Sequence, residues 1–311
     1  IRSRNCWKDI GDSSRLWYDP VGSLHLAYNQ MEWQVLQELF VAFKEEGRDV
    51  ALLSTNEVFS RSGIAKKENC QGGLFSREEL IIDPREAIAF LPEYFQATLN
   101  IQFNWGRAVT AVSPGNITSG AERIEADLIF ICSGADFKTL YPGEFEKFPL
   151  TKCKLQMMRL TLEGSPRIGA SLCGGLSLIH YPAFRAASSL DELRQYYEKE
   201  MPEYLKWGIH VMVSQNHLGH LTIGDSHEYG PSPDPFDKQC INDLILKYLN
   251  QFTSLRNPKL IETWNGVYGK LTNADSEIFF SPEPGVFILN GVGGTGMTMS
   301  FGLAEELINT L

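Results

Sequence analysis

Four glycines stand close together near the end of this 311-residue chain, where the sequence reads Gly-Val-Gly-Gly-Thr-Gly from Gly291 to Gly296. An apolar run of strand type, 286–289, precedes them, and a segment of helical period follows. A turn between strand and helix directs free backbone N–H groups and the positive end of the helix dipole at one point. Glycines there let a flat or anionic ligand approach closely, because no Cβ intervenes. A purely structural turn is the alternative, but Thr295 and Thr298 beside the glycines favour a ligand site.

Composition narrows the class of protein. The 43% hydrophobic content is ample for one large or two moderate cores. A net charge of −10 without a basic cluster argues against a nucleic-acid partner, and no apolar run approaches the about 20 residues of a membrane span. The six cysteines include no C-x-x-C pair, so a reduced, cytoplasmic setting is the simplest interpretation. His217 and His220 have no third ligand at a usual spacing, so no metal site is predicted.

Two kinds of strand pattern occur along the chain. Residues 154–162, 171–180, 209–215 and 220–225 alternate apolar with polar side chains, which predicts a large antiparallel sheet with one open face. The nearly all-apolar segment 125–135 instead predicts a buried strand that is covered on both faces, as in a parallel sheet.

Between these strands, one helix has clear start signals. Asp83 is placed to cap it and Pro84 to occupy its first position, so we expect a helix that reaches about Leu99. Alternating residues predict two further strands, at 101–104 and 107–112.

The pattern interleaves two domains in a mixed α/β fold. Residues 77–150 and 277–311 are expected to form one domain, with strands flanked by helices. Residues 12–76 and 151–276 are expected to form the other, which is mainly antiparallel.

The segment 291–305, which contains the glycine turn, resembles the C-terminal flavin-contacting signature of the D-amino acid oxidase-like family of FAD-dependent amine oxidoreductases. The resemblance covers the whole chain. Segment 124–135 is similar to the family's central strand and its small-residue turn against FAD, and 107–112 to a short strand whose valine backbone meets the adenine. The cofactor neighbours that this resemblance implies are Val109, Ser133, Gly134, Gly291, Gly293, Gly294, Thr295, Gly296, Met297 and Thr298.

The resemblance also implies a Rossmann-like FAD-binding domain for 77–150 and 277–311, interleaved with a substrate-binding domain. A family member opens with a strand, a G-x-G-x-x-G turn and a helix, and none of these stands in this sequence. Judged against the family, the N-terminal βαβ unit that binds the pyrophosphate is missing. We therefore expect this polypeptide alone to bind FAD poorly or not at all.

Within the family, segments 22–27, 152–159 and 224–230 resemble FAD-dependent oxidoreductases that are associated with bacterial phosphonate catabolism. That likeness implies 2-aminoethylphosphonate or its N-methyl derivative as substrate. Oxidases of α-amino acids in the family carry an arginine in a Trp-x-Gly-x-Arg strand, whereas this strand, which starts at Trp264, has Tyr268 in that place. This replacement weakens the case for a glycine or D-amino acid substrate.

The implied reaction is the two-electron oxidation of a C–N bond in a small primary or secondary amine, with oxygen or another acceptor reoxidising the flavin. Candidates for anchoring the substrate are Lys154, Gln156, Arg159, His180, His227 and Tyr268. For Lys154 and Arg159 the plain alternative is a solvated cation on a sheet, and for His227 it is a surface loop.

Three other interpretations stay open. In the first, the chain is an inactive fragment of such an enzyme. In the second, it is a glycine- or sarcosine-type amino acid oxidase. In the third, it is a subunit that needs a partner to complete the FAD site. The oligomeric state and the catalytic residue are left open.

Overall fold

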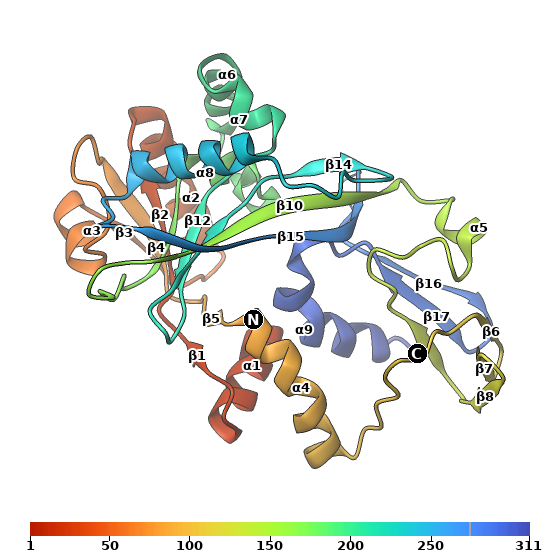
Figure 1. Ribbon diagram of the computed structural model, residues 1–311. Coiled ribbons are helices and arrows are strands. Elements are labelled where there is room, and N and C mark those ends of the chain that lie inside the picture. Colours follow the sequence, from red (N-terminus) through yellow and green to blue (C-terminus); the bar gives the residue numbers. More distant parts are fainter. Residues whose placement is uncertain (274) are drawn as a thin grey trace.

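The computed structural model describes residues 1–273 and 275–311, and its largest element is a nine-stranded sheet (Figure 1). Its strand order is β14 (Glu228–Gly230), β10 (Leu150–Thr161), β13 (Leu221–Gly224), β12 (Met212–Gln215), β11 (Ser171–Cys173), β2 (Ser23–Ala27), β4 (Gly72–Ser76) and β3 (Val50–Leu53), and β15 (Lys259–Leu271) also pairs with β10. Neighbouring strands are antiparallel except β11 and β2, which are parallel. The predicted antiparallel sheet is thereby confirmed.

Helices cover one side of this sheet (Figure 1). They are α2 (Gln30–Glu45), α3 (Thr55–Arg61), α6 (Leu190–Glu200), α7 (Pro202–Lys206) and α8 (Gln239–Phe252). The main core lies between the layers, where Leu24 of β2, Val213 of β12 and Ile245 of α8 are all 0% exposed. Each such side chain contributes about 1.5–3 kcal/mol of burial free energy, which fixes the frame that positions the site.

A second, smaller sheet has the order β16 (Ile278–Glu283), β17 (Val286–Asn290) and β9 (Ile129–Ile131). Strand β17 runs antiparallel to β16 and parallel to β9. A short 3-10 helix, η3 (Gly293–Thr295), and helix α9 (Gly296–Ile308) follow β17 directly. The predicted succession of strand, glycine turn and helix is confirmed.

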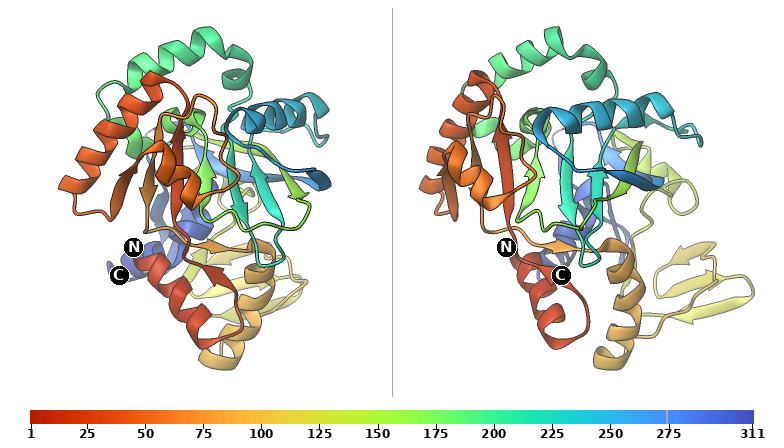
Figure 2. Two further views of the ribbon diagram at one scale, coloured as in Figure 1. Left: turned by 90° about the vertical axis from the view of Figure 1, so that its left-hand side faces the viewer. Right: turned by 60° about the vertical axis from the view of Figure 1, so that its left-hand side comes forward.

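Helix α9 packs against α1 (Arg2–Ser13) and lies in one apolar cluster with residues of α4 (Pro84–Leu99). The Ser3 hydroxyl donates to the carbonyl of Met299 and accepts from the backbone N–H of Gly302, so the two ends of the chain meet (Figure 2). Helix α4 begins as predicted: Asp83 accepts from the Arg85 N–H and Pro84 occupies the first turn. The expected helix up to Leu99 is confirmed.

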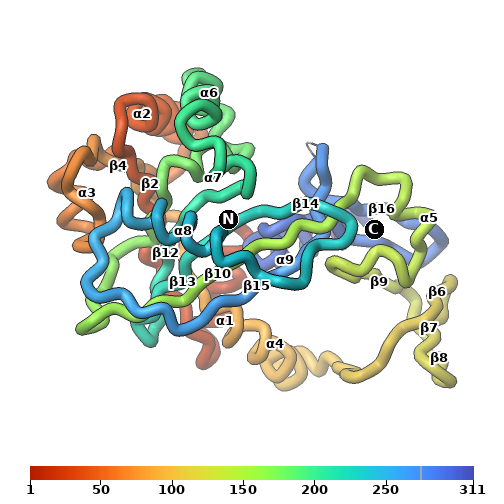
Figure 3. Tube along the Cα trace, turned by 45° about the horizontal axis from the view of Figure 1, so that its top comes forward, coloured from red at the N-terminus to blue at the C-terminus, as the bar shows by residue number. Residues whose placement is uncertain are grey.

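The remaining elements are short. They are β1 (Tyr18–Asp19), β5 (Ile81–Ile82), α5 (Pro142–Phe145), the 3-10 helices η1 (Gly175–Ile179) and η2 (Pro182–Ala186), and the strands β6 (Ala111–Ser113), β7 (Asn116–Ser119) and β8 (Glu122–Glu125). Strands β6 to β8 form their own antiparallel sheet, which projects from the body of the molecule (Figures 2 and 3).

Four strand predictions, 101–104, 107–112, 125–135 and 171–180, were wrong in whole or in part. Residues 101–110 contain no strand, and Trp105 there is 73% exposed, so the alternation has no core face to bury. Segment 125–135 forms only the strand Ile129–Ile131, and Phe130 is 41% exposed, so the strand is covered on one face and not on both. Segment 171–180 is a strand only to Cys173, after which η1 turns the chain.

The long strands β10 and β15 pair along their length and run from the large sheet toward the glycine turn (Figures 1 and 3). Through this pairing, residues near Tyr268 on β15 reach η3 while the start of β15 stays in the large sheet. The six cysteines are free thiols. Within the described residues, no helix combines the length and the apolar character needed to cross a membrane.

Candidate functional site

The glycine turn is held in a conformation that suits glycine. Gly291 has φ +75° and Gly293 has φ +60°, both in the left-handed region. Such values cost an ordinary residue about 1–2 kcal/mol. Gly294 and Thr295 are exposed, and no acidic residue stands in the first turn of α9 to neutralise its dipole. The start of α9 therefore presents positive potential to an open surface.

Asn290, which the sequence analysis did not single out, ties the turn to a second predicted segment. Its side chain is buried, accepts from the Gly291 N–H at 2.6 Å and donates to the Ser133 hydroxyl at 3.2 Å. Gly134 has φ +60°, and nothing lies within 4 Å of the position that its Cβ would take. The loop at 133–134 and the glycine turn therefore meet at one place, with open space beside Gly134.

Two residues of β15 approach the turn from the large sheet. A Cβ on Gly294 would lie 3.4 Å from the Tyr268 hydroxyl oxygen. A Cβ on Gly293 would lie 3.6 Å from Nζ of Lys270, the next residue on the same face of the strand. Burial raises the pKa of Tyr268, so its phenol stays neutral and can donate a hydrogen bond.

These residues fit the FAD that the sequence led us to expect. The turn supplies glycines without Cβ atoms, exposed threonines and the uncompensated N-terminus of α9. A ring that becomes electron-rich on reduction is stabilised by such donors. Ser133, Gly134, Gly291, Gly293, Gly294, Thr295, Gly296, Met297 and Thr298 all belong to these two adjoining segments.

Val109, the predicted adenine neighbour, lies elsewhere in the chain path. It is half-buried in the segment that leads into β6, where the next residue, Thr110, donates its N–H to the Thr118 carbonyl. Its role toward the cofactor stays a prediction.

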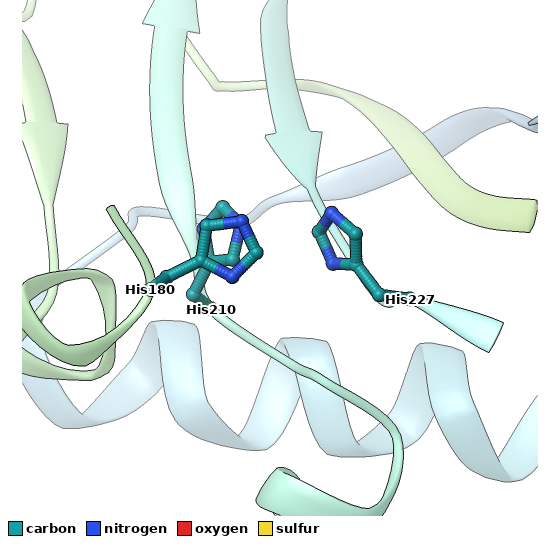
Figure 4. Close-up of side chains that lie close together, drawn as sticks. All are labelled: His180, His210 and His227. Carbon is teal, nitrogen blue, oxygen red and sulfur yellow. The ribbon is translucent and has the colours of Figure 1, made fainter. Parts of the chain in front are cut away.

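Three histidines from separate elements gather into a second feature, which we call the histidine cluster: His180, His210 and His227 (Figure 4). Their ring centroids are 3.8 Å apart for His180 and His210, 4.6 Å for His180 and His227, and 5.1 Å for His210 and His227. His180 follows η1, His210 precedes β12 and His227 lies between β13 and β14. The sequence analysis nominated His180 and His227 but missed His210, which belongs to no motif.

Backbone pairing holds the histidine cluster together. His210 and Asp225 exchange both backbone hydrogen bonds, at 3.2 and 2.8 Å, and the N–H of His227 donates to the Trp207 carbonyl. On the side-chain level, Nδ1 of His227 lies 3.0 Å from the Gly208 carbonyl oxygen, which makes that nitrogen the donor. This hydrogen bond fixes the orientation of the His227 ring.

Asp225 joins the histidine cluster through its carboxyl group. Its Oδ1 lies 3.1 Å from Nε2 of His210 and 3.9 Å from Nδ1 of His227. Within residues 1–273 and 275–311, Nδ1 of His210 is a buried polar atom without a hydrogen-bond partner, and so is Oδ1 of Asp225, because the 3.1 Å approach of His210 Nε2 lacks the angles of a hydrogen bond. Buried polar atoms of this kind normally find a partner, so a ligand is a physical reason for both.

Burial dominates the protonation of this cluster. It raises the pKa of Asp225 to about 8 and lowers that of His180 to about 3 and that of His227 to about 4. The pKa of His210 is also lowered, first by burial and then by the neighbouring rings. The charge of Lys270 lowers the pKa of all three imidazoles further. At neutral pH the cluster therefore holds neutral rings and a largely protonated acid.

A chain of contacts leads from the histidine cluster to the glycine turn. Cys153 of β10 stands opposite Tyr229 of β14 on one side and Tyr268 of β15 on the other. The charge of Asp225 contributes to raising the pKa of Cys153, Tyr229 and Tyr268 alike. Of the nominated residues, Tyr268 therefore lies at the turn, and His180 and His227 are linked to it through Tyr229 and Cys153.

The other three nominated residues have protein partners. Lys154 is 1% exposed, and its ammonium group donates to the carbonyls of Asp234 and Phe236. Gln156 donates to the Lys238 carbonyl and to the Asn242 side chain.

Arg159 is also buried and has a partner outside the site. It lies 3.5 Å from the Asp83 carboxylate, which caps α4. Burial works to raise the pKa of Asp83, but hydrogen bonds from Asn216 and the Arg85 backbone prevail and lower it. Neither Arg159 nor the other two is a solvated surface side chain, and their substrate roles stay predictions.

Comparison with known proteins adds to this geometry. The family model described as "DAO: FAD dependent oxidoreductase" matches residues 1–310. No curated protein sequence gives a significant match.

Several solved structures share the fold. L-proline dehydrogenase from P. horikoshii superposes with a TM-score of 0.76 at 15% identity, covering 98% of this chain and 75% of that one. Glycine oxidase from Geobacillus kaustophilus gives 0.72 at 14%, with 96% and 74% covered. L-alpha-glycerophosphate oxidase from Mycoplasma pneumoniae, with FAD bound, gives 0.72 at 17%, with 98% and 77% covered. At these identities the likeness establishes the fold alone.

Proposed function

This chain belongs to the DAO family of FAD-dependent oxidoreductases, and we propose that it oxidises a C–N bond of a small primary or secondary amine. The observation that carries the proposal is the contact between Tyr268 and the glycine turn. A neutral hydrogen-bond donor from the large sheet stands there, 3.4 Å from the Cβ position of Gly294. A substrate on that sheet is in reach of a ring held by the turn.

The reaction removes two electrons and two protons from the amine. The substrate C–H bond and one N–H bond break, a C=N bond forms, and water then hydrolyses the imine to a carbonyl compound and either ammonia (from a primary amine) or a free amine (from a secondary amine). FAD, when bound, supplies the acceptor for the hydride equivalent, and oxygen or another acceptor takes up the electrons afterwards. We propose that this enzyme works in the cytoplasm.

Protein residues bind and orient the reactants. The backbone N–H groups from Gly293 to Thr298 and the dipole of α9 would hold the edge of the cofactor where negative charge accumulates. Asn290 keeps Gly291 and Ser133 in place through its two hydrogen bonds. Tyr268 donates to the substrate or to the ring.

For the substrate we propose 2-aminoethylphosphonate or its N-methyl derivative. Tyr268, which replaces the carboxylate-binding arginine of the resembling amino acid oxidases, supports this choice over glycine or sarcosine. Lys270 adds a positive charge on the same face of β15, next to Gly293. Both features suit an anionic head other than the α-carboxylate.

The alternative is that this stretch of chain does not hold FAD by itself. Phe130 of β9 is 41% exposed and stacks on Phe287 of β17 at 5.3 Å, so part of the smaller sheet presents aromatic rings to solvent. Exposed aromatic surface on a sheet is a common site for further protein to pack. This observation supports the idea that a further unit completes the FAD site.

Peroxide release from the FAD-loaded protein tests the proposal. Glycine, sarcosine, 2-aminoethylphosphonate and its N-methyl form are offered at equal concentration, and a redox dye replaces oxygen in a parallel assay. We expect the two phosphonates to be turned over best. Turnover of glycine alone would leave amine oxidation standing and would refute the phosphonate substrate.

A further inference from the structure

We propose that His180, His210 and His227, together with Lys270, form the receptor for a tetrahedral oxyanion head group of the substrate. The amine end of the same substrate then lies toward the Gly293–Thr298 turn. This inference rests on the proposed amine oxidation and adds to it the residues that choose the substrate.

Unsatisfied polar atoms in and beside the histidine cluster are one reason to expect a ligand there. Asp225 Oδ1 and His210 Nδ1 are buried and lack a hydrogen-bond partner within the described residues. Leaving such atoms unpaired carries a cost in free energy. A ligand with several oxygen acceptors recovers part of that cost when it binds.

The histidine cluster and Asp225 also supply hydrogen-bond donors for an anion. A neutral imidazole donates from one nitrogen, and the Asp225 acid, whose pKa burial raises to about 8, carries a proton at neutral pH. His227 already uses Nδ1 toward the Gly208 carbonyl, so its Nε2 becomes a donor only if the ring takes up a second proton. A bound anion favours that protonation.

Lys270 places a positive charge near the histidine cluster. Lys270 lowers the pKa of all three imidazoles, so its positive charge acts across the histidine cluster. The same ammonium group lies at Gly293, 3.6 Å from the Cβ position of that glycine. One fixed cation thus serves both the cluster and the turn, and it attracts an anion and repels a metal ion.

A metal ion is the alternative ligand for the three histidines. One candidate ligand atom from each histidine lies within 4.8 Å of the others. Two nitrogens on a single zinc ion, each about 2.1 Å from it, can stand no more than about 4.2 Å apart. Because 4.8 Å is only the upper limit of the spacings, the spacing alone does not decide between the two ligands, and the positive charge of Lys270 is what favours an anion.

Binding is tested on the FAD-loaded protein by calorimetric titration with methylphosphonate, which has the head group and no amine. We expect His180→Gln and Lys270→Met to weaken methylphosphonate binding by about tenfold or more, because each removes a charge-assisted hydrogen bond. His217→Gln, which changes a histidine outside the cluster, is the matched control and should bind as the wild type does. Equal binding by all four proteins would overturn the receptor.

Selectivity is tested with amines that share a two-carbon spacer: 2-aminoethylphosphonate, 2-aminoethylsulfonate, β-alanine and propylamine. We expect kcat/KM to be highest for the phosphonate, and His180→Gln and Lys270→Met to lower the ratio of kcat/KM for the phosphonate to kcat/KM for propylamine by about tenfold or more. Equal kcat/KM for the four amines would reject the receptor and keep amine oxidation. If no amine is oxidised, the proposed function fails, and the methylphosphonate titration still decides the receptor.

Two further results would also overturn the inference. Inorganic phosphate that binds without competing against 2-aminoethylphosphonate would mark an anion site unrelated to the substrate. Zinc binding to the wild type that is lost in His180→Gln, without any methylphosphonate binding, would identify a metal site in its place.

Discussion

Tyr268 contacts the glycine turn at Gly294, where a Cβ would lie 3.4 Å from the phenol oxygen. The two residues belong to different sheets, since β15 extends the large sheet and the turn follows β17 of the small one. Their contact puts a substrate-facing strand against the expected flavin site.

Two neighbouring glycines should respond differently to alanine. Gly293 has φ +60°, so Gly293→Ala is expected to lower the free energy of unfolding by about 1–2 kcal/mol. Gly294 has an ordinary φ and an exposed surface, so Gly294→Ala should change stability by less than about 1 kcal/mol. We expect it instead to weaken FAD binding by about tenfold, because the methyl group would stand between the turn and Tyr268, where we place the edge of the ring.

Thermal unfolding and fluorescence titration with FAD measure the two effects separately. FAD affinity equal to that of the wild type in Gly294→Ala would contradict the placement of the ring at the turn.

Asn290 should matter for stability as well as for the cofactor. Asn290→Leu removes the acceptor for the Gly291 N–H and the donor to Ser133, which predicts a loss of about 1–3 kcal/mol in the free energy of unfolding. Asn309→Leu, at the exposed end of α9, is the control and should lie within about 0.5 kcal/mol of the wild type. Denaturant titration gives both values, and equal effects would show that the Asn290 bonds are dispensable.

Lys154 separates a structural role from substrate binding. Its buried ammonium group bonds two backbone carbonyls and lies 3.3 Å from Asp237, so Lys154→Met should destabilise the fold by about 2–4 kcal/mol. We expect KM for the amine to stay unchanged. Lys199→Met, at an 82% exposed side chain, is the control. A higher KM with normal stability would favour the substrate role that the sequence predicted.

The histidine cluster should leave a mark on the pH dependence of stability. The folded pKa of Asp225, about 8, is above its ordinary value of 3.8, so its contribution to stability is present below about pH 4 and is lost as pH rises to about 8. The folded pKa values of His180 and His227 lie below 6.5, so these rings reduce stability as pH falls below 6.5.

Asp225→Asn removes the first effect only. The difference in Tm between this variant and the wild type should therefore increase in favour of the variant from pH 5 to pH 8, by at least about 2 °C. A difference that does not change with pH would show that the carboxyl group ionises normally.

Local signals predicted much of this structure from sequence. The capping residue and proline at the start of α4 determine that helix through contacts within a few residues, and so does the glycine turn before α9. The strands at 101–104 and 107–112 were predicted from alternation alone, and alternation forms a strand only when one face finds a core. Trp105 finds none.

The candidate site was harder to predict, because its parts meet only in three dimensions. His210 precedes a strand without any motif, and its place beside His180 depends on η1 turning the chain after Cys173. Asn290 ends an apolar strand and looks like a loop residue until Ser133 is seen next to it. Asp225 stood in a segment that carried the resemblance, and only its buried, unpartnered oxygen marks it out.

A crystal structure of the protein with FAD bound tests the central claim most directly. We predict that the isoalloxazine ring contacts the backbone between Gly293 and Thr298. Tyr268 should lie at the edge of the ring, and the histidine cluster should lie farther from the turn than Tyr268. A ring bound away from residues 291–298 would contradict the placement of the cofactor, and with it the mechanism proposed for this chain.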